Sequence, residues 1–277
     1  MKISLITACY NSAATIRTAI ESVLSQKGVD VEYVVVDGGS KDGTADIIKE
    51  YADKTLNSQL LTPNFTFRWL SESDKEMYDA INKGIKMATG DVVGILNADD
   101  MFESENTLAH VVAAFRSGGV ESGGVGERVD CVYADIRFVK DDLQTTSRYY
   151  SAKHWKPWML QWGKMPPHPS VYIRRKLFER HGLYKLGYDI AADYELLVRY
   201  LRKAGVTARY IAGSVVRMRM GGKSTRGWRS NLKLNQEIVR ANRENGYFCC
   251  LPMLLPKYLF KIFEFILPRL GFDVRKQ

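Results

Sequence analysis

The sequence predicts an α/β fold with a largely parallel central sheet covered by helices on both faces. Short apolar runs alternate with amphipathic helical patterns along the first third of the chain. The strand-like runs are continuously apolar, as in "VEYVVVD" at 31–37, which is typical of strands buried on both sides. With 277 residues the chain can bury a sizeable core, as one large domain or as one domain with an appendage.

The first hundred residues predict a regular alternation of strands and helices. Asn11 and Ser12 can cap a first helix, whose apolar residues recur at helical spacing. Each strand-like run is rich in β-branched or aromatic residues and ends at polar or glycine-containing positions. We expect strands at 2–10, 31–39, 67–72 and 90–96, and helices at 16–24, 42–52 and 77–88.

The alternation of strand-like and helix-like segments is less regular after residue 100. No repeat or interdomain linker is evident. A glycine-rich stretch at 117–127 predicts a loop, and "MPPHP" at 165–169 predicts a turn. An aromatic segment, "HWKPWMLQW", precedes that turn. We expect helices at 108–117 and 192–205, and strands at 131–139 and 170–175.

Charge is unevenly distributed. Residues 201–277 hold 16 Lys and Arg against 4 Asp and Glu, whereas the first 200 residues are slightly acidic. A basic C-terminal quarter suits phosphates, nucleic acid or an anionic membrane, or is simply a solvated surface. The four cysteines show no CxxC spacing, which fits a reducing compartment and argues against a structural zinc site or a disulfide framework. The N-terminus has no signal-peptide pattern, so we expect a cytoplasmic protein.

The C-terminal segment is strongly apolar but is interrupted by charges. Lys257, Lys261 and Glu264 recur at helical spacing and form a polar stripe on an otherwise apolar helix between Pro256 and Pro268. Such a helix suits a membrane interface better than a membrane span. The alternatives are a helix docked on the domain and a homodimer contact.

Acidic residues follow the predicted strands at their C-terminal ends, the edge at which open α/β sheets bind ligands. Asp37 precedes a glycine turn and could bind a ribose or a base, or the segment could be a plain capping turn in which Asp42 caps the next helix. Glu72, Asp74 and Asp79 form a second acidic group, around a loop that leads into a helix.

The stretch "NADD" at 97–100 ends a buried strand on two adjacent carboxylates. Asp99 and Asp100 repel each other unless a cation lies nearby, and a hard divalent cation takes oxygen ligands of this kind. A metal-free helix cap is the alternative. Asp193, at the start of a helix that also carries Glu195, could be another cap or a general base within reach of a substrate hydroxyl.

Four motifs in a fixed order resemble the inverting family 2 glycosyltransferases. They are "LITACYNSAATIRTAIESVLSQ", "VVVDGGSKDGT", "SESDKEMYDAINKGIKMATGDVVGILNADD" and "DYELLVR". The resemblance implies the GT-A fold, a Rossmann-like, mostly parallel sheet flanked by helices, over roughly residues 1–225. It divides that domain into a nucleotide-binding half, 1–100, and an acceptor-binding half, 101–225, and leaves 226–277 as an amphipathic helical extension.

The resemblance also implies roles for single residues. The acid Asp193 matches the catalytic base, although the common Glu-Asp pair is Ala192-Asp193 here. "NADD" stands where the family has its DXD motif, which holds Mn²⁺ or Mg²⁺ and the donor diphosphate. Asn97 replaces the first acid of that motif, so Asp99 and then Asp100 become the expected metal ligands. The remaining residues expected to border the nucleotide or its sugar are Thr7, Cys9, Tyr10, Asp37, Asp74 and Lys75.

Two further groups complete the expected site. The segment "RMRMGGKSTRGW" offers Arg217, Arg219, Lys223, Ser224 and Arg226 as a loop that could cradle the diphosphate, unless it is simply solvated. Aromatic faces suit sugars, so His168 and the tryptophans 155, 158 and 162 could line the acceptor side; core packing is the alternative.

We therefore expect transfer of one sugar from a UDP- or GDP-sugar to a hydroxyl of a glycan or a polyprenol-linked acceptor, with inversion, in cell-envelope polysaccharide synthesis. The QxxRW motif and spanning helices of processive synthases are missing. The expected location is the inner face of the cell membrane, with the C-terminal helix on its anionic surface. A sugar nucleotidyltransferase is the alternative enzyme, and a basic nucleic-acid-binding protein is a third hypothesis that no nucleic-acid motif supports.

Overall fold

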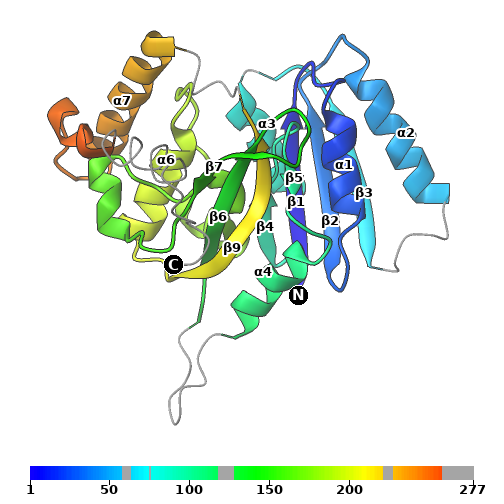
Figure 1. Cartoon of the computed structure of the whole chain (residues 1–277), viewed down its shortest axis with the longest axis horizontal. Coiled ribbons are helices and arrows are strands. Elements are labelled where there is room, and N and C mark those ends of the chain that lie inside the picture. Colours follow the sequence, from blue (N-terminus) through cyan, green and yellow to red (C-terminus); the bar gives the residue numbers. More distant parts are fainter. Residues whose placement is uncertain (58–63, 75, 118–127, 221–226, 258–277) are drawn as a thin grey trace.

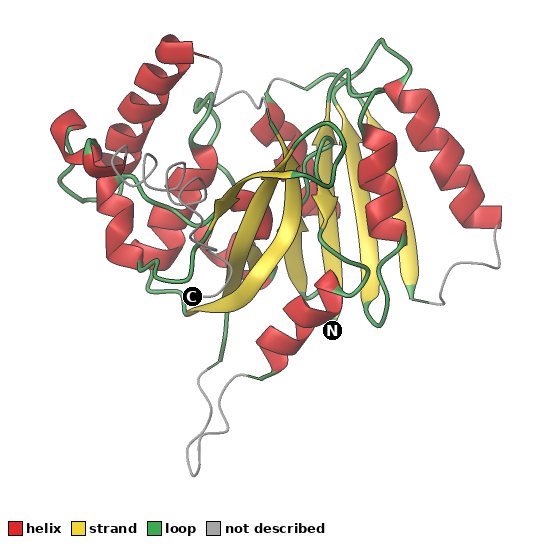
Figure 2. Ribbon diagram, in the orientation of Figure 1, coloured by secondary structure: helices red, strands yellow, loops and turns green. Residues whose placement is uncertain are grey.

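The computed structural model describes residues 1–57, 64–74, 76–117, 128–220 and 227–257. Within them, nine strands form a single sheet in the order β3-β2-β1-β4-β8-β6-β9-β5, with β7 paired to β6 (Figures 1 and 2). The strands are β1 Lys2–Cys9, β2 Asp30–Asp37, β3 Phe65–Ser71, β4 Val92–Ile95, β5 Met101–Phe102, β6 Cys131–Val139, β7 Thr146–Tyr150, β8 Tyr172–Arg174 and β9 Ala208–Arg219.

The sheet is parallel at one end and mixed at the other. Strands β3, β2, β1 and β4 are mutually parallel, which confirms the prediction for the first half of the chain. Beyond β4 the sheet changes direction, because β8 is antiparallel to both β4 and β6. Strand β9 then lies parallel to β6, and Figure 2 shows these two long strands curving away from the parallel part.

Helices connect and cover the strands. They are α1 Ile16–Leu24, α2 Thr44–Asn57, α3 Met77–Met87, α4 Thr107–Arg116, α5 Lys176–His181, α6 Ala192–Leu197 and α7 Gly227–Glu244. The 3-10 helices are η1 Pro157–Trp162, η2 His168–Ser170 and η5 Leu251–Leu254, and the π-helix is η3 Val198–Lys203. None of the helices in the described part of the chain combines the length and the hydropathy that crossing a bilayer requires.

The two faces of the sheet carry two separate hydrophobic cores, as continuously apolar strands predict. In β2, Tyr33 and Val35 point into a core shared with α1, α2 and α4. Val34 and Val36 point the opposite way, into a core shared with α3, α6 and the residues around α7. A strand with period-two geometry thus buries every residue when helices cover both of its sides.

Close packing fixes α3 and β8 against the sheet. A Cβ on Gly84 of α3 would lie 2.5 Å from a side-chain carbon of Ile6, and a Cβ on Gly94 of β4 would lie 2.5 Å from the Tyr172 ring. Glycine at these positions therefore allows the helix and the neighbouring strand to approach at their observed distances.

Two sequence predictions need correction, and the start of the predicted extension can be described. The helix expected at 192–205 is a short α-helix followed by a π-helix. Arg217 and Arg219, expected in a loop, are the last part of the long strand β9. The start of the extension, α7, contributes Ile238 and Ala241 to the domain core, so its described part packs on the domain. The apolar helix expected at 256–268 lies almost entirely outside the described residues.

Candidate active site

The candidate site lies at the C-terminal edge of the parallel strands. Because β1, β2, β3 and β4 run in the same direction, the segments that follow them meet at one edge of the sheet. Those segments contain Tyr10, Asp37, Asp74 and the "NADD" stretch. The topology thus brings together the acidic residues that sequence spacing alone could only order along the chain.

Most residues at the C-terminal end of β1 are buried. Thr7 is fully buried, and its hydroxyl donates to the Leu96 carbonyl oxygen at 2.8 Å. Cys9 is also buried, and both burial and the nearby Asp37 carboxylate raise the pKa of its thiol. Tyr10, by contrast, is 62% exposed. Of the three residues expected to border the base, Tyr10 is therefore the one that presents its side chain to a ligand.

Asp37 is completely buried, and both of its carboxylate oxygens already accept hydrogen bonds. Oδ2 accepts from the Ser71 hydroxyl at 2.6 Å and from the Ser40 backbone N–H at 3.1 Å, while Oδ1 accepts from the Ser40 hydroxyl. The expected contact of Asp37 with a base or ribose stays a prediction. In the structure Asp37 holds together the ends of β2 and β3.

The loops after β1 and β2 are joined by side-chain to backbone hydrogen bonds. Asn11, which has a positive φ of 49°, accepts from the Lys41 N–H at 3.0 Å and donates its own N–H to the Ser40 hydroxyl at 2.8 Å. Such left-handed backbone is unfavourable for a residue other than glycine and persists where neighbouring groups fix it. The loops form a rigid rim beside the exposed Tyr10 ring.

Asp74 follows β3 and lies against this rim. Lys83 of α3 pairs with Asp74 and contacts Glu72 at 2.7 Å and Asp79 at 3.7 Å, so the predicted acidic group surrounds a single cation. Burial raises the pKa of Asp74 despite that pairing. Its Oδ2 atom is buried without a hydrogen-bond partner, and a Cβ on Gly38 would lie 3.3 Å from it. Lys75, expected beside Asp74, lies outside the described residues.

The "NADD" stretch forms a tight turn after β4. Asp100 is 1% exposed, and its Oδ2 accepts from the Asn97 amide at 2.7 Å, whereas its Oδ1 has no hydrogen-bond partner. Burial and the adjacent Asp99 carboxylate raise the pKa of Asp100. Asp99 itself is partly exposed. One carboxylate is therefore open to a ligand, and the other has a buried oxygen in need of a partner.

This donor set fits a divalent cation. A buried carboxylate oxygen without a partner is costly, and a cation between adjacent carboxylates removes both that cost and their repulsion. In the described part of the chain no three His, Cys, Asp or Glu side chains converge as a ready-made metal cage. Mg²⁺ and similar ions are commonly held by one or two carboxylates together with substrate phosphates, which is the arrangement that Asp99 and Asp100 offer.

The two described arginines of the predicted basic segment have different partners. Arg219 donates from Nε to the Asp99 carbonyl oxygen at 3.1 Å, which places its guanidinium beside the turn. Arg217 is held elsewhere, because it pairs with Glu103 at 3.3 Å and donates to the Glu103 carbonyl oxygen at 2.9 Å. Lys223, Ser224 and Arg226 lie outside the described residues.

Asp193 lies in a group of aromatic side chains at the start of α6. Its Oδ1 is 3.4 Å from the Tyr78 hydroxyl of α3 and accepts from the Tyr194 N–H at 2.7 Å. Burial raises the pKa of Asp193, and the nearby His168 opposes that shift. His168 is close through its Nε2 atom to the Tyr184 hydroxyl, at 2.7 Å. A raised pKa makes the Asp193 carboxylate a stronger base than an exposed aspartate.

The tryptophans differ in their exposure. Trp155 is 2% exposed, donates to the Lys164 carbonyl oxygen and packs edge-on against Tyr133, so it belongs to the core. Trp158 and Trp162, both on η1, are 57% and 40% exposed. Trp158 is thus a surface side chain, and among the described residues no contact joins it to Asp193.

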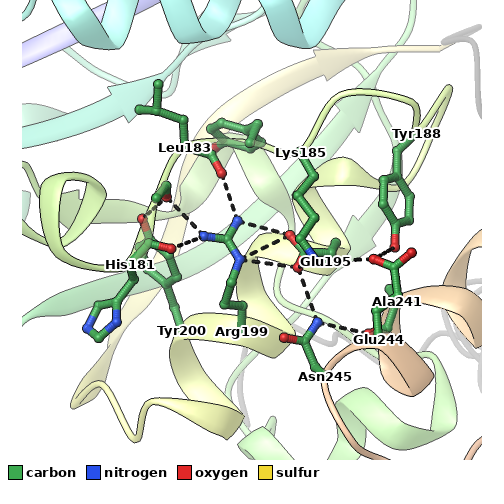
Figure 3. A network of polar contacts seen from close by, with 12 residues as sticks. His181, Leu183, Lys185, Tyr188, Glu195, Arg199, Tyr200, Ala241, Glu244 and Asn245 are labelled. Atoms are coloured by element: carbon green, nitrogen blue, oxygen red, sulfur yellow. Dashed lines mark hydrogen bonds and ion pairs between the residues drawn. The ribbon is translucent and has the colours of Figure 1, made fainter.

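The helix that carries Asp193 is anchored from its buried side. Glu195, two residues later, is fully buried and pairs with Arg199 at 2.9 Å and with Lys185 at 3.0 Å (Figure 3). Asn245, just after α7, donates to the same carboxylate at 3.1 Å. Sequence reasoning assigned no role to this network: the Glu195–Arg199 pair has the i,i+4 spacing of a helical ion pair, but Asn245 joins it from fifty residues away.

Comparison with known proteins shows which family the chain belongs to. Residues 4–182, more than half of the chain, match the model of the family described as Glycosyl transferase family 2. The PGL/p-HBAD biosynthesis glycosyltransferase of Mycobacterium bovis (strain BCG / Pasteur 1173P2) is 30% identical over 208 residues, which cover 75% of this chain and 73% of that protein. An uncharacterized glycosyltransferase of Mycobacterium tuberculosis (strain ATCC 25618 / H37Rv) is 29% identical over 199 residues, 71% of this chain and 68% of that protein.

Solved structures share the fold. S. aureus TarS 1-349 in complex with UDP-GlcNAc has a TM-score of 0.64 and 17% identity, and the match covers 100% of this chain and 76% of that chain. The mannosyltransferase PcManGT from Pyrobaculum calidifontis, in complex with GDP-Man and Mn²⁺, has a TM-score of 0.61 and 19% identity, and the match covers 94% of this chain and 69% of that chain. The family match and the shared architecture establish that this chain belongs to glycosyltransferase family 2 and has the GT-A fold.

Proposed function

We propose that this glycosyltransferase moves one sugar from a nucleotide-sugar donor to an acceptor hydroxyl with inversion, and that it depends on a divalent metal. The observation that carries the proposal is the pair of unlike carboxylate sites. One is "NADD", with a partnerless buried oxygen on Asp100, and the other is Asp193, whose carboxylate lies beside the Tyr78 hydroxyl and has a pKa raised by burial. The first suits a metal diphosphate and the second suits a general base.

The chain's own residues have separate roles in this reaction. The Asp193 carboxylate accepts the proton of the acceptor hydroxyl as the oxygen attacks the anomeric carbon, and the nucleoside diphosphate departs from the opposite face. A single displacement of this kind inverts the anomeric configuration. Arg219 lies where it can neutralise charge on the leaving diphosphate.

Asp99 and Asp100 would hold the metal. When bound, a divalent cation supplies Lewis-acid neutralisation of the diphosphate leaving group. Mn²⁺ or Mg²⁺ is proposed, and the likeness to structures with Mn²⁺ and a nucleotide supports this choice. Asn97 positions Asp100 through its amide and leaves Oδ1 available.

The proposed donor is a UDP- or GDP-sugar. Structural neighbours are bound to UDP, UDP-GlcNAc or GDP-Man, which supports the donor class but not a particular sugar. Tyr10 is the exposed aromatic face proposed to contact the base, while Thr7, Cys9 and Asp37 shape the wall behind it. Asp74, with its partnerless oxygen, is proposed to accept a hydrogen bond from the nucleotide sugar. Lys75, Lys223 and Ser224 remain proposed donor contacts on the sequence resemblance alone.

The acceptor is proposed to be a glycan or a lipid-linked sugar of the cell envelope. His168 borders Asp193, and Trp158 offers an exposed ring, so both are proposed acceptor contacts. Phe248, Leu251 and Leu255 are 71%, 44% and 63% exposed and lead into the apolar basic tail, which supports peripheral contact with the inner face of the membrane. A homodimer contact through the same tail remains the alternative.

Product analysis tests the proposal. The enzyme is incubated with a panel of nucleotide sugars and lipid-linked or glycan acceptors, and free nucleoside diphosphate is measured together with the anomeric configuration of the product by NMR. Nucleoside diphosphate and an inverted linkage support the proposal, and both should be lost in Asp193→Asn. Release of pyrophosphate would indicate a nucleotidyltransferase, and a retained configuration would overturn the assigned mechanism.

A further inference from the structure

The segment that leads into the proposed base is irregular and depends on another helix for its shape. Residues 187–191 lie outside any helix or strand and precede α6, whose second residue is Asp193. Backbone N–H groups in such a segment need partners from elsewhere in the fold. The Gly187 N–H donates to Glu76 Oε2 at 3.4 Å, whereas the partners of the N–H groups of 189–191 come from α7, a helix more than thirty residues further along the chain.

Glu237 of α7 supplies those partners. Its Oε1 accepts from the Asp189 N–H at 2.9 Å, and its Oε2 accepts from the N–H groups of Ile190 at 2.9 Å and Ala191 at 2.8 Å. Glu237 is 7% exposed, so water competes little for these bonds. A single carboxylate thus binds three consecutive amides immediately before the helix that carries Asp193.

The same segment is held from the opposite side by the site itself. The Tyr78 hydroxyl donates to the Ile190 carbonyl oxygen at 2.7 Å, and that hydroxyl lies 3.4 Å from Asp193 Oδ1. Ile190 therefore bonds to Glu237 through its N–H and to Tyr78 through its carbonyl group. If the segment moved away from Glu237, the Tyr78 hydroxyl bonded to Ile190 would move as well, and its distance to Asp193 would change.

Other α7 contacts to this segment are more exposed. Lys233 pairs with Asp189, and Arg240 donates to the Gly187 carbonyl oxygen at 2.9 Å, but the side chains of Lys233 and Arg240 are about half exposed. Exposed pairs of this kind contribute little, whereas hydrogen bonds from buried amides to a carboxylate are among the stronger ones. Glu244 of α7 accepts from the Tyr188 hydroxyl at 3.0 Å, which is a side-chain contact, whereas Glu237 binds the backbone amides of the segment.

We propose that Glu237 is a positioning residue for the catalytic carboxylate: by binding the amides of 189–191 it sets where α6 begins and where Asp193 points. The proposal rests on the proposed function for its effect on turnover. Glu237 touches neither Asp193 nor the nucleotide edge in any contact of the described residues, so it acts through the backbone. A displacement of about 1 Å in a reacting group can lower turnover about 100-fold.

Kinetics and amide exchange on the full-length enzyme test this role. Glu237→Ala should lower kcat about 10- to 100-fold and leave the donor KM within about twofold, because the donor edge is untouched. Glu237→Gln keeps the shape and one accepting oxygen, so it should recover part of kcat. Hydrogen exchange of the peptide covering 187–193 should accelerate in both variants, and exchange in β1 should stay at its wild-type rate.

Glu244→Gln is the matched control. It removes the charge of the other carboxylate of α7, whose partners are the side chains of Lys185, Tyr188 and Arg240 and no backbone amide of 189–191. Its carboxamide oxygen can still accept from the Tyr188 hydroxyl, so its kcat and its exchange at 187–193 should stay near wild type. If Glu237→Ala does not fold, the kcat and the hydrogen exchange of Glu237→Gln decide the test.

The outcomes separate this inference from the proposed function. Unchanged exchange at 187–193 in the Glu237 variants, or a kcat within about twofold of wild type, would overturn the positioning role. A loss that Glu244→Gln reproduces would also overturn it, because it would then reflect charge on α7. Failure of the wild-type enzyme to turn over any nucleotide sugar would instead reject the proposed function, and the exchange result would still show whether Glu237 fixes the segment.

Discussion

The Tyr78 hydroxyl lies 3.4 Å from Oδ1 of Asp193 and joins the helix after the Asp74 loop to the helix that carries the proposed base. It also donates to the Ile190 carbonyl oxygen at 2.7 Å. Helix α3 and the segment that leads into α6 are therefore joined through one buried hydroxyl.

Tyr78→Phe is expected to weaken this connection without emptying the core. The ring stays, but the buried Ile190 carbonyl group loses its donor, which typically costs about 1–3 kcal/mol of unfolding free energy. We expect a lower melting temperature and a several-fold lower kcat with an unchanged donor KM. Thermal unfolding and steady-state kinetics measure both. A variant with wild-type stability and kcat would show that the hydroxyl holds neither the segment nor the base.

The pH dependence of turnover should reflect Asp193. The base must be deprotonated, and burial raises its pKa above that of an exposed aspartate, which is about 3.9. Turnover should therefore be constant at higher pH and fall as the pH drops through that raised value. Removing the Tyr78 hydroxyl takes away a donor that favours the charged form, so the acid limb should move to higher pH in Tyr78→Phe. A pH profile of kcat at saturating donor measures the shift, and a limb that moves to lower pH would contradict the assignment.

Arg219 and Arg217 should differ in their effect on the donor. Arg219 donates a hydrogen bond to the Asp99 carbonyl oxygen, whereas Arg217 forms an ion pair with Glu103. Arg219→Ala is expected to weaken nucleoside diphosphate binding about 10-fold or more, because a cation beside a diphosphate makes charge-assisted hydrogen bonds. Arg217→Ala should change binding less. Calorimetry on both variants decides between them, and a larger loss in Arg217→Ala would restore the role that the sequence predicts for it.

Gly94→Ala should destabilise the fold through one contact. The added Cβ would lie 2.5 Å and 2.6 Å from two carbons of the buried Tyr172 ring, and overpacking of this kind typically costs about 1–3 kcal/mol. Denaturant unfolding measures the cost. The same substitution in a Tyr172→Leu background should cost clearly less, because the ring is gone. Equal costs in the two backgrounds would show that another contact is responsible.

Sequence patterns predicted the part of the fold in which neighbouring elements pair. The run "VEYVVVD" fixed β2 as a strand buried on both sides, and the acids after β2, β3 and β4 marked the edge that carries the site. The spacing of apolar residues and the residue types at turns are local properties of the chain, so these features can be derived from one sequence.

The features that were missed depend on long-range contacts. Asp37 accepts a hydrogen bond from Ser71, which lies on the neighbouring strand. Arg219 donates to the carbonyl group of Asp99, which is 120 residues earlier in the chain. Glu237 carries no local mark in its helix, because its partners are backbone amides of a distant segment.

Binding of nucleotide sugars with and without Mn²⁺ to the wild-type enzyme, Asp99→Ala and the surface control Asp53→Ala tests the central claim most directly. Calorimetry should show metal-dependent binding of one nucleotide sugar to wild type and to Asp53→Ala, and binding weakened about 10-fold or more in Asp99→Ala. Binding that is equal in all three proteins and indifferent to metal would contradict the claim that "NADD" holds the metal and the donor diphosphate.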